Sequence, residues 1–167
     1  MKAIKLLFLL MLSSFFKSNS QEVESSTYNV MLQALLSHSV KEVSVSQLKN
    51  GEKDIIYLDS RAKEEYEVSH IEDAIWVGYE NPDFSRISSL DKDSKLVVYC
   101  SVGYRSEKLA EKLKAKGFTN VSNLYGGIFE WKNQGYQVVD EKNEPTDSVH
   151  AYNKVWGIWL NNGVKVY

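Results

Sequence analysis

The chain has 167 residues, of which 43% are hydrophobic and 25% charged, a composition typical of one globular domain with a sizeable core. Its formal net charge of −2 disfavours nucleic acid or an anionic membrane surface as a partner. Cys100 is the single cysteine, so no intrachain disulfide forms. The lone thiol is therefore either an inert core residue or a functional group.

The first twenty residues have the pattern of an export signal. Lys2 and Lys5 precede the apolar run 6–12, and small residues occupy positions 18–20. We predict a secretory signal peptide over 1–20 and an exported, periplasmic or secreted protein of 17 basic and 22 acidic residues, net −5. A retained anchor is the alternative. The run is shorter than the roughly 20 residues that cross a bilayer, so no stable membrane insertion is expected after cleavage.

Short apolar runs alternate with helical patterns through the middle of the chain. This alternation predicts an α/β fold with a mainly parallel central sheet and helices on both faces. Ligands of such sheets collect beyond the carboxyl ends of the strands. The predicted helices span 28–38, 46–49, 62–68 and 105–116, with another after 126–127, and the predicted strands span 43–45, 55–58, 74–77, 96–99 and 121–125, with a helical or irregular connection over 83–90.

Residues 140–167 are predicted to be a C-terminal extension. Its first part is polar and contains Pro145, as in a linker. Five apolar residues between 149 and 160, including Trp156 and Trp159, then recur at helical spacing and predict a tryptophan-containing helix. A hairpin turning at 161–163 is the alternative. The extension either packs on the domain, docks a partner or covers an active site.

Cys100 lies between a predicted buried strand and the predicted helix 105–116. Unpaired amide N–H groups and the positive end of the helix dipole converge at such a place and stabilise a thiolate, a persulfide or a bound anion. Gly103 allows a positive φ with which a short loop wraps its amides around the sulfur. Four residues separate Cys100 from Arg105. The arrangement suits a sulfur nucleophile.

Five runs occur in a specific order between about residues 40 and 139: 57–61 with Glu65-Tyr66, 69–74, 100–106, 117–121, and 124–128 with Trp131. This set resembles the rhodanese-like family of sulfurtransferases. The resemblance implies a rhodanese-like fold over 21–139 and a Cys100 that holds sulfane sulfur as a persulfide. The chain departs from the family at Ser69 and Asp73, where glycine is common, and local adjustment is expected there.

The resemblance also implies a mechanism without a cofactor. The Cys100 thiolate attacks the outer sulfur of a donor such as thiosulfate or a persulfide, and an acceptor such as cyanide, a small thiol or a thioredoxin-like protein then removes that sulfur. Arg105 orients an anionic donor, unless it is a surface residue paired with Glu107. The remaining substrate-binding residues are those of the loop: Ser101, Val102, Gly103, Tyr104 and Ser106.

Other polar residues near the strand ends are predicted to be structural. Arg61 is expected to pair with Glu64 or Glu65, Asp59 to hold loop amides, and His70 to be a hydrogen-bonded turn residue. The glycines at 126–127 suit close packing of a helix on the sheet. No metal site is implied, because the three histidines, His38, His70 and His150, are isolated from one another in the sequence.

Two other function classes remain open. A phosphatase or arsenate reductase also uses a cysteine, a loop and an arginine, but such loops typically hold five intervening residues rather than four. A non-enzymatic module is the third hypothesis, in which Cys100 relays persulfide or redox equivalents to a bound partner.

Overall fold

A computed structural model describes residues 23–49 and 53–167. The predicted signal peptide, residues 1–20, lies outside this range. Within the described ranges, no helix combines the length and apolar character needed to cross a membrane.

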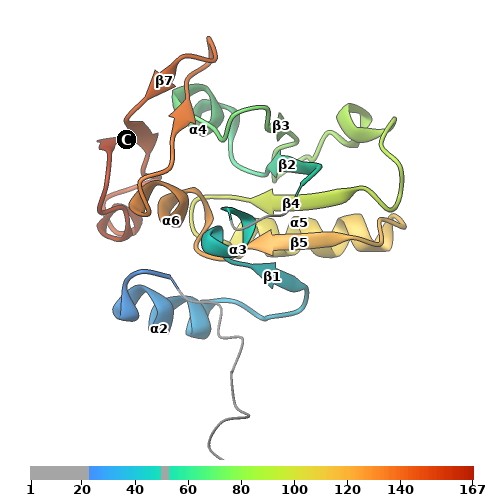
Figure 1. The fold of residues 1–167 in the computed structure, drawn as a ribbon, viewed down its shortest axis with the longest axis horizontal. Helices are drawn as coiled ribbons and strands as arrows, with labels where there is room; N and C mark the ends of the chain where they lie inside the picture. Colours follow the sequence, from blue (N-terminus) through green and yellow to red (C-terminus); the bar gives the residue numbers. More distant parts are fainter. Residues whose placement is uncertain (1–22, 50–52) are drawn as a thin grey trace, which may run out of the picture.

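The core of the fold is a five-stranded, wholly parallel sheet (Figure 1). The strands stand in the order β1-β5-β4-β2-β3, so the α/β prediction is confirmed. Each strand begins and ends within two residues of its predicted boundaries. Their bounds are Lys41–Val43 (β1), Ile55–Asp59 (β2), Ile75–Trp76 (β3), Lys95–Tyr99 (β4) and Val121–Leu124 (β5).

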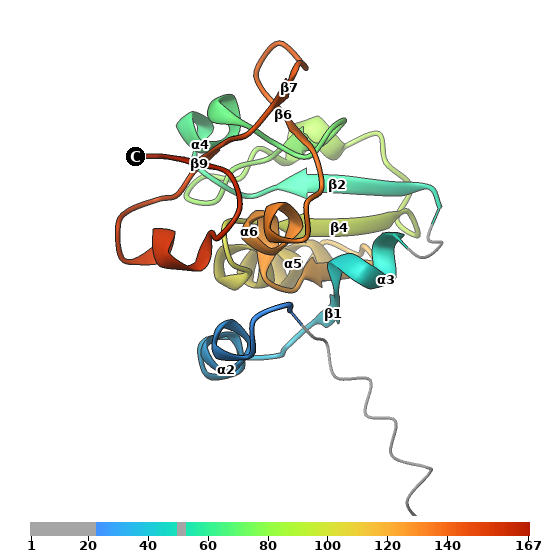
Figure 2. The same cartoon turned by 60° about the vertical axis from the view of Figure 1, so that its left-hand side comes forward.

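Helices cover both faces of the sheet (Figure 2). Alternating residues of β4 show the division: Leu96 and Val98 pack in the cluster that holds Leu109 and Leu113, whereas Val97 packs in the opposite cluster. The first cluster belongs to α5, and the second to α2, α3, α6 and the C-terminal tail. The helices are Ser26–Leu35 (α2), Val45–Lys49 (α3), Lys63–Val68 (α4), Tyr104–Ala115 (α5) and Gly127–Asn133 (α6), with a 3₁₀ turn over Phe84–Ile87 (η2).

Helix α2 begins two residues earlier than predicted because Ser25 caps it, accepting a hydrogen bond from the Tyr28 amide. Tyr28 and Leu32 face the core and are fully buried. The Tyr28 hydroxyl donates to the Gly126 carbonyl at 2.8 Å. These contacts fix α2 beside the turn that opens α6.

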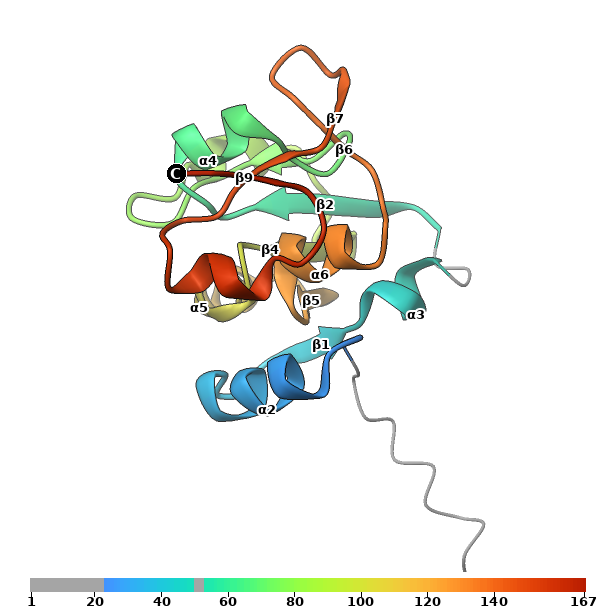
Figure 3. The same cartoon turned by 90° about the vertical axis from the view of Figure 1, so that its left-hand side faces the viewer.

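The tail, coloured orange to red, lies on the same side of the sheet as α2, coloured blue (Figure 3). The helix predicted across residues 149–160 is wrong: only a 3₁₀ turn, Trp156–Trp159 (η3), forms. Tyr152 has φ +64°, and the Asn153 side chain accepts from the amides of Val155 and Trp156, so the chain turns where a helix would continue. The short strands are Val138–Val139 (β6), Pro145–Thr146 (β7), Ser148–His150 (β8) and Val164–Val166 (β9).

The alternative hairpin is also absent from the tail, since β8 and β9 pair in parallel. The tail packs on the domain through Val149, Ala151 and Leu160, each fully buried. Trp159 stacks on Tyr28 with ring centroids 5.3 Å apart. The two segments that flank the central fold therefore touch each other.

Candidate functional site

Cys100 directly follows β4 and precedes α5, as the sequence predicts. It is 1% exposed. The Gly103 amide donates to its sulfur at 3.1 Å, and the Ser106 hydroxyl oxygen lies 3.5 Å from the sulfur. The thiol thus lies inside a turn formed by the next six residues.

The peptide groups after Cys100 are oriented by α6. The carbonyls of Cys100 and Ser101 accept from the amides of Ile128 and Phe129 at 2.9 and 3.1 Å. Because the N–H and C=O of a trans peptide point in opposite directions, the amides of Ser101 and Val102 face away from α6. Of the amides 101–106, only that of Gly103 has an acceptor within the described part of the chain. Five donors are left for a ligand or water.

Two glycines permit this geometry. Gly103 has φ +121°, which an L side chain rarely adopts. A Cβ on Gly127 would lie 2.4 Å from the Cys100 carbonyl oxygen, so only glycine allows α6 to approach the loop. The prediction that the glycines at 126–127 serve close packing is confirmed.

Asn123, on β5, holds the loop from the side and was missed by the sequence analysis. Its amide nitrogen donates to the Gly103 carbonyl at 3.0 Å, and its amide oxygen lies 2.7 Å from the Ser106 hydroxyl. All three residues are buried. A polar residue inside a predicted buried strand was the available signal.

Arg105 is not paired with Glu107. Its two terminal nitrogens donate to both carboxylate oxygens of Glu65, at 2.6 and 2.8 Å, and one also donates to the Ser101 hydroxyl at 2.9 Å. Glu107 is fully buried and accepts instead from the amides of Ser37 and Ser39. Arg105 therefore joins α4 to the cysteine loop.

Glu65 is 2% exposed and accepts a further hydrogen bond from the Ser101 hydroxyl at 3.0 Å. Burial disfavours its charged form, but the hydrogen bonds and charge of Arg105, together with the charge of Arg61, outweigh that cost and lower the pKa of Glu65. The carboxylate is therefore ionised at neutral pH and fixes the positions of Arg105 and Ser101.

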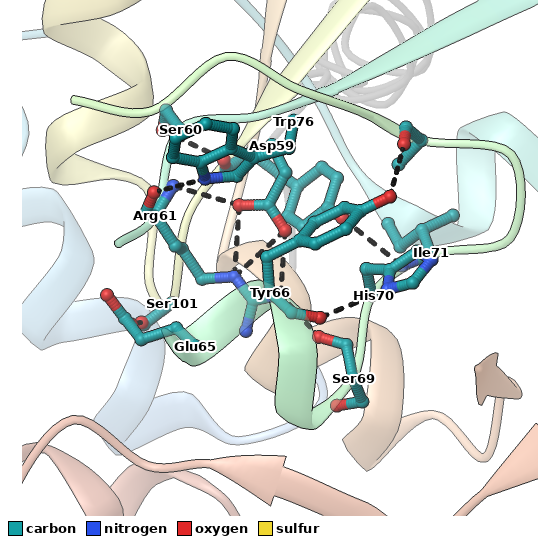
Figure 4. Close-up of polar contacts among 12 residues, drawn as sticks. Asp59, Ser60, Arg61, Glu65, Tyr66, Ser69, His70, Ile71, Trp76 and Ser101 are labelled. Carbon is teal, nitrogen blue, oxygen red and sulfur yellow. Dashed lines mark hydrogen bonds and ion pairs between the residues drawn. The ribbon is translucent and has the colours of Figure 1, made fainter. Parts of the chain in front are cut away.

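Arg61 pairs with Asp59 rather than with Glu64 or Glu65, which corrects the sequence prediction (Figure 4). Its Nε and Nη2 donate to the Asp59 carboxylate at 3.1 and 2.7 Å, and Nη2 also donates to the Ser69 carbonyl at 2.5 Å. Asp59 accepts from the Arg61 amide, as predicted for a residue that holds loop amides. Nη1 of Arg61 is buried without a partner among the described residues.

His70 is a hydrogen-bonded turn residue, as predicted (Figure 4). Its Nδ1 lies 3.1 Å from the Tyr66 carbonyl, and its amide donates to the Val139 carbonyl. Nearby, Asp73 has φ +60°, a conformation that Asp tolerates better than most residues, and Ser69 has an extended backbone with φ −170°, which any residue can adopt. The two departures from the common glycine pattern are thus accommodated locally.

A cavity of about 690 Å³ opens beside the loop. Four of the predicted site residues line it: Ser101, Val102, Tyr104 and Arg105. Cys100 itself is not part of the lining, although the next two residues of the chain are. Across residues 23–49 and 53–167, no group of three or more His, Cys, Asp or Glu side chains is placed to hold a metal ion.

The family model described as "Rhodanese-like domain" matches residues 43–134, which include the cysteine loop, strands β2 to β5 and the last residue of β1. The chain belongs to the rhodanese-like domain family. This membership supports a sulfurtransferase-type or related enzyme.

Three solved structures resemble the chain. The BH2092 protein of Bacillus halodurans is 27% identical, with a TM-score of 0.54, over 68% of this chain and 84% of that one. The rhodanese-like domain of the Anabaena Alr3790 protein is 28% identical, with a TM-score of 0.54, over 59% and 78%. A thiosulfate sulfurtransferase of Pseudomonas aeruginosa shares the fold, with a TM-score of 0.52 and 20% sequence identity. The match covers 60% of this chain and 20% of that one.

Among curated relatives, the tRNA uridine(34) hydroxylase of Sodalis glossinidius is 32% identical over 65% of this chain and 31% of its own length. The mitochondrial protein HIGH ARSENIC CONTENT 1 of Arabidopsis thaliana is 35% identical over 48% of this chain and 54% of its own length. The rhodanese-like chain thus spans at most about half the length of these relatives.

Proposed function

We propose that this rhodanese-like protein is an exported sulfurtransferase that holds sulfane sulfur as a persulfide on Cys100. The observation that supports the proposal is the environment of the sulfur: one amide donates to it, and five neighbouring amides have no acceptor in the described part of the chain. Such a set of donors suits the negative charge of a thiolate or of the outer sulfur of a persulfide.

The first half-reaction is a displacement at sulfur. The Cys100 thiolate attacks the outer sulfur of a donor such as thiosulfate, the S–S bond of the donor breaks, and sulfite leaves with the bonding electron pair. The outer sulfur of the new persulfide then lies among the amides of the loop, which includes Val102, Gly103 and Tyr104. In the second half-reaction a thiol or cyanide removes that sulfur and regenerates the thiolate.

Arg105 has a positioning role in this proposal as well as a charge. Its terminal nitrogens hold Glu65 and Ser101, so the amides of the loop are left as the main donors to an anionic substrate. Burial opposes the charged form of Arg105, but its hydrogen bonds to Glu65, together with the nearby negative charges at Cys100 and Glu65, raise the pKa of the guanidinium. Ser106 supports the loop through Asn123.

The acceptor and the compartment complete the proposal. A small thiol or a thioredoxin-like protein would take the sulfur outside the cytoplasm, after cleavage of a signal over residues 1–20. Comparing the N-terminal residue of the protein recovered from an exported fraction with Gln21 tests that part separately.

The central test measures thiosulfate-dependent thiocyanate formation together with the mass of the protein purified without reductant. We expect one added sulfur on the peptide that contains Cys100, and turnover that Cys100→Ala abolishes while the fold is retained. Ser122→Ala, on the neighbouring strand and away from the loop contacts, is the matched control and should retain activity. Turnover by Cys100→Ala would refute the assignment of the nucleophile.

Arsenate reduction is a second candidate, because arsenate reductases also use a cysteine, a loop and an arginine; the name of the Arabidopsis relative refers to arsenic content and not to a reaction. The loop has four residues between Cys100 and Arg105, fewer than the five typical of oxyanion-processing cysteine sites. Assays with arsenate and a phosphatase substrate, run beside thiosulfate, separate these activities. A protein that acquires the added sulfur but turns over none of the three would instead be a non-enzymatic persulfide relay.

A further inference from the structure

Three of the fifteen residues that line the cavity beside the cysteine loop come from parts of the chain outside the family match. Leu35 comes from α2, and Tyr152 and Trp156 come from the tail. The family match covers only residues 43–134. The central fold therefore supplies most of the wall, and the segments that flank it add Leu35 and two aromatic side chains.

Five of the fifteen residues that line the cavity are aromatic. Side chains from four separate segments meet there, and their rings provide flat apolar surface for a ligand of similar character. The tail is fixed against the loop, because the Arg105 guanidinium lies 5.2 Å from the ring centre of Tyr152. The apolar lining consists chiefly of Leu35, Trp76, Tyr79, Tyr104, Tyr152 and Trp156.

The charges in the lining offset one another. Arg61 and Arg105 carry positive charge, and Glu65 and Glu80 carry negative charge. Both arginines are already paired, with Asp59 and with Glu65. The remaining carboxylate, Glu80, is exposed to solvent. A small dianion therefore finds no unpaired positive charge in the lining, whereas a neutral organic molecule needs none.

The volume supports the same ligand class. About 690 Å³ lies within the range of roughly 300–1,000 Å³ that is usual for sites of organic ligands, and far exceeds the space that an inorganic sulfur anion needs. Ser101 and Val102 form part of the wall, so a molecule in the cavity lies next to the loop that holds Cys100.

We propose that this cavity receives the sulfur acceptor, and that the acceptor is a small organic thiol with a neutral aromatic body. The inference rests on the proposed sulfurtransferase function and specifies its second half-reaction. The acceptor thiolate attacks the outer sulfur of the Cys100 persulfide, a new S–S bond forms, and the enzyme S–S bond breaks. The Cys100 thiolate leaves with the electron pair, and the product is the persulfide of the acceptor.

A binding experiment tests the ligand class without any turnover. Benzyl methyl sulfide, which has no thiol to react, is titrated into the Cys100→Ala protein and followed by calorimetry and tryptophan fluorescence. We expect saturable binding that Trp156→Ala weakens at least tenfold and Trp156→Phe weakens less. Ile158→Ala, in the same 3₁₀ turn but exposed and outside the lining, is the control and should bind as before. Dimethyl sulfide should not bind measurably.

A kinetic experiment on the full chain tests the role of the cavity. We expect kcat/KM for benzyl mercaptan to exceed that for 2-mercaptoethanol at least tenfold and Trp156→Ala to remove this preference. The control Ile158→Ala, outside the lining, should keep both the preference and the rate with cyanide. Equal use of the two thiols, or use of a thioredoxin-like protein dithiol that is insensitive to Trp156, would overturn the inference and leave the sulfurtransferase proposal standing. Binding of the sulfide without transfer to any acceptor would overturn the sulfurtransferase proposal and keep the ligand class.

Discussion

The two arginine–carboxylate pairs near the cysteine loop have similar chemistry but different surroundings. Asp59 and Arg61 are two residues apart, and both side chains are fully buried. Glu65 and Arg105 come from α4 and α5, and the Arg105 side chain is 17% exposed at the cavity wall. The first pair fixes the end of β2, and the second fixes the loop around the sulfur. The role of each ion pair is therefore determined by its position relative to the cysteine loop, because the residue types in the two pairs are alike.

The largest effect is expected from Asp59→Asn. This change leaves the Arg61 charge buried without its counter-charge, which should lower the free energy of unfolding by about 3–5 kcal/mol. Urea denaturation followed by circular dichroism measures it. Asp93→Asn, the same substitution at an exposed residue with no side-chain bond shown, is the control. A loss no greater than that of the control would contradict the structural role of the pair.

Glu65→Gln should cost less stability but more function. The partly exposed Arg105 regains some contact with water, so a loss of about 2 kcal/mol is expected. Sulfur transfer should fall more than tenfold, because Ser101 and Arg105 are both released. Steady-state rates measure this, with the exposed neighbour Glu64→Gln as the matched control. An unchanged rate would remove the pair from the site.

The same pair predicts a pH dependence. The pKa of Glu65 lies below its ordinary value of 4.5 in the folded protein, despite the opposing effect of burial, because Arg105 and Arg61 favour the carboxylate. Its contribution to stability is therefore fully present above pH 4.5 and is lost as the pH falls through the lower, folded value. The stability difference between the wild type and Glu65→Gln should shrink over that acidic window. A constant difference from pH 7 to 3 is the result that this explanation does not allow.

The smallest loss of stability is expected when the ion pair that is removed is exposed to solvent. Lys63 and Glu67 form an ion pair on the surface of α4, with side chains 47% and 45% exposed. Water and salt screen such a pair, so Lys63→Ala should leave the denaturation midpoint within error of the wild type. A shift comparable to that of Glu65→Gln would mean that exposure is a poor guide to these pairs.

The sequence was sufficient for the sheet and for the place of the thiol. The runs 55–58 and 96–99 are apolar enough to be buried strands, and Cys100 follows one of them directly. The partners of the charged residues were not predictable in the same way. Glu65 lies near Arg61 in the sequence but meets Arg105, 40 positions away, because the sheet brings the ends of β2 and β4 together. Pairings of this kind depend on topology, which local spacing does not encode.

The tail was predicted least well, again for a physical reason. Apolar residues at helical spacing were interpreted as one helix face. Instead, Asn153 caps a turn, Val149 is buried from strand β8, and Leu160 is buried at the end of the 3₁₀ turn η3. The periodicity of apolar residues indicates that a segment has a buried side, but it does not determine which backbone conformation brings those side chains into the core.

The stacking of Tyr28 on Trp159 has a practical consequence for anyone shortening this protein. A fragment trimmed to the family match, residues 43–134, would lose Tyr28 at one end and Trp159 at the other. It would also expose the core residues against which Val149, Ala151 and Leu160 pack. The newly exposed hydrophobic surface would favour aggregation during expression. Recombinant work should therefore keep residues 23–167 together as a single unit.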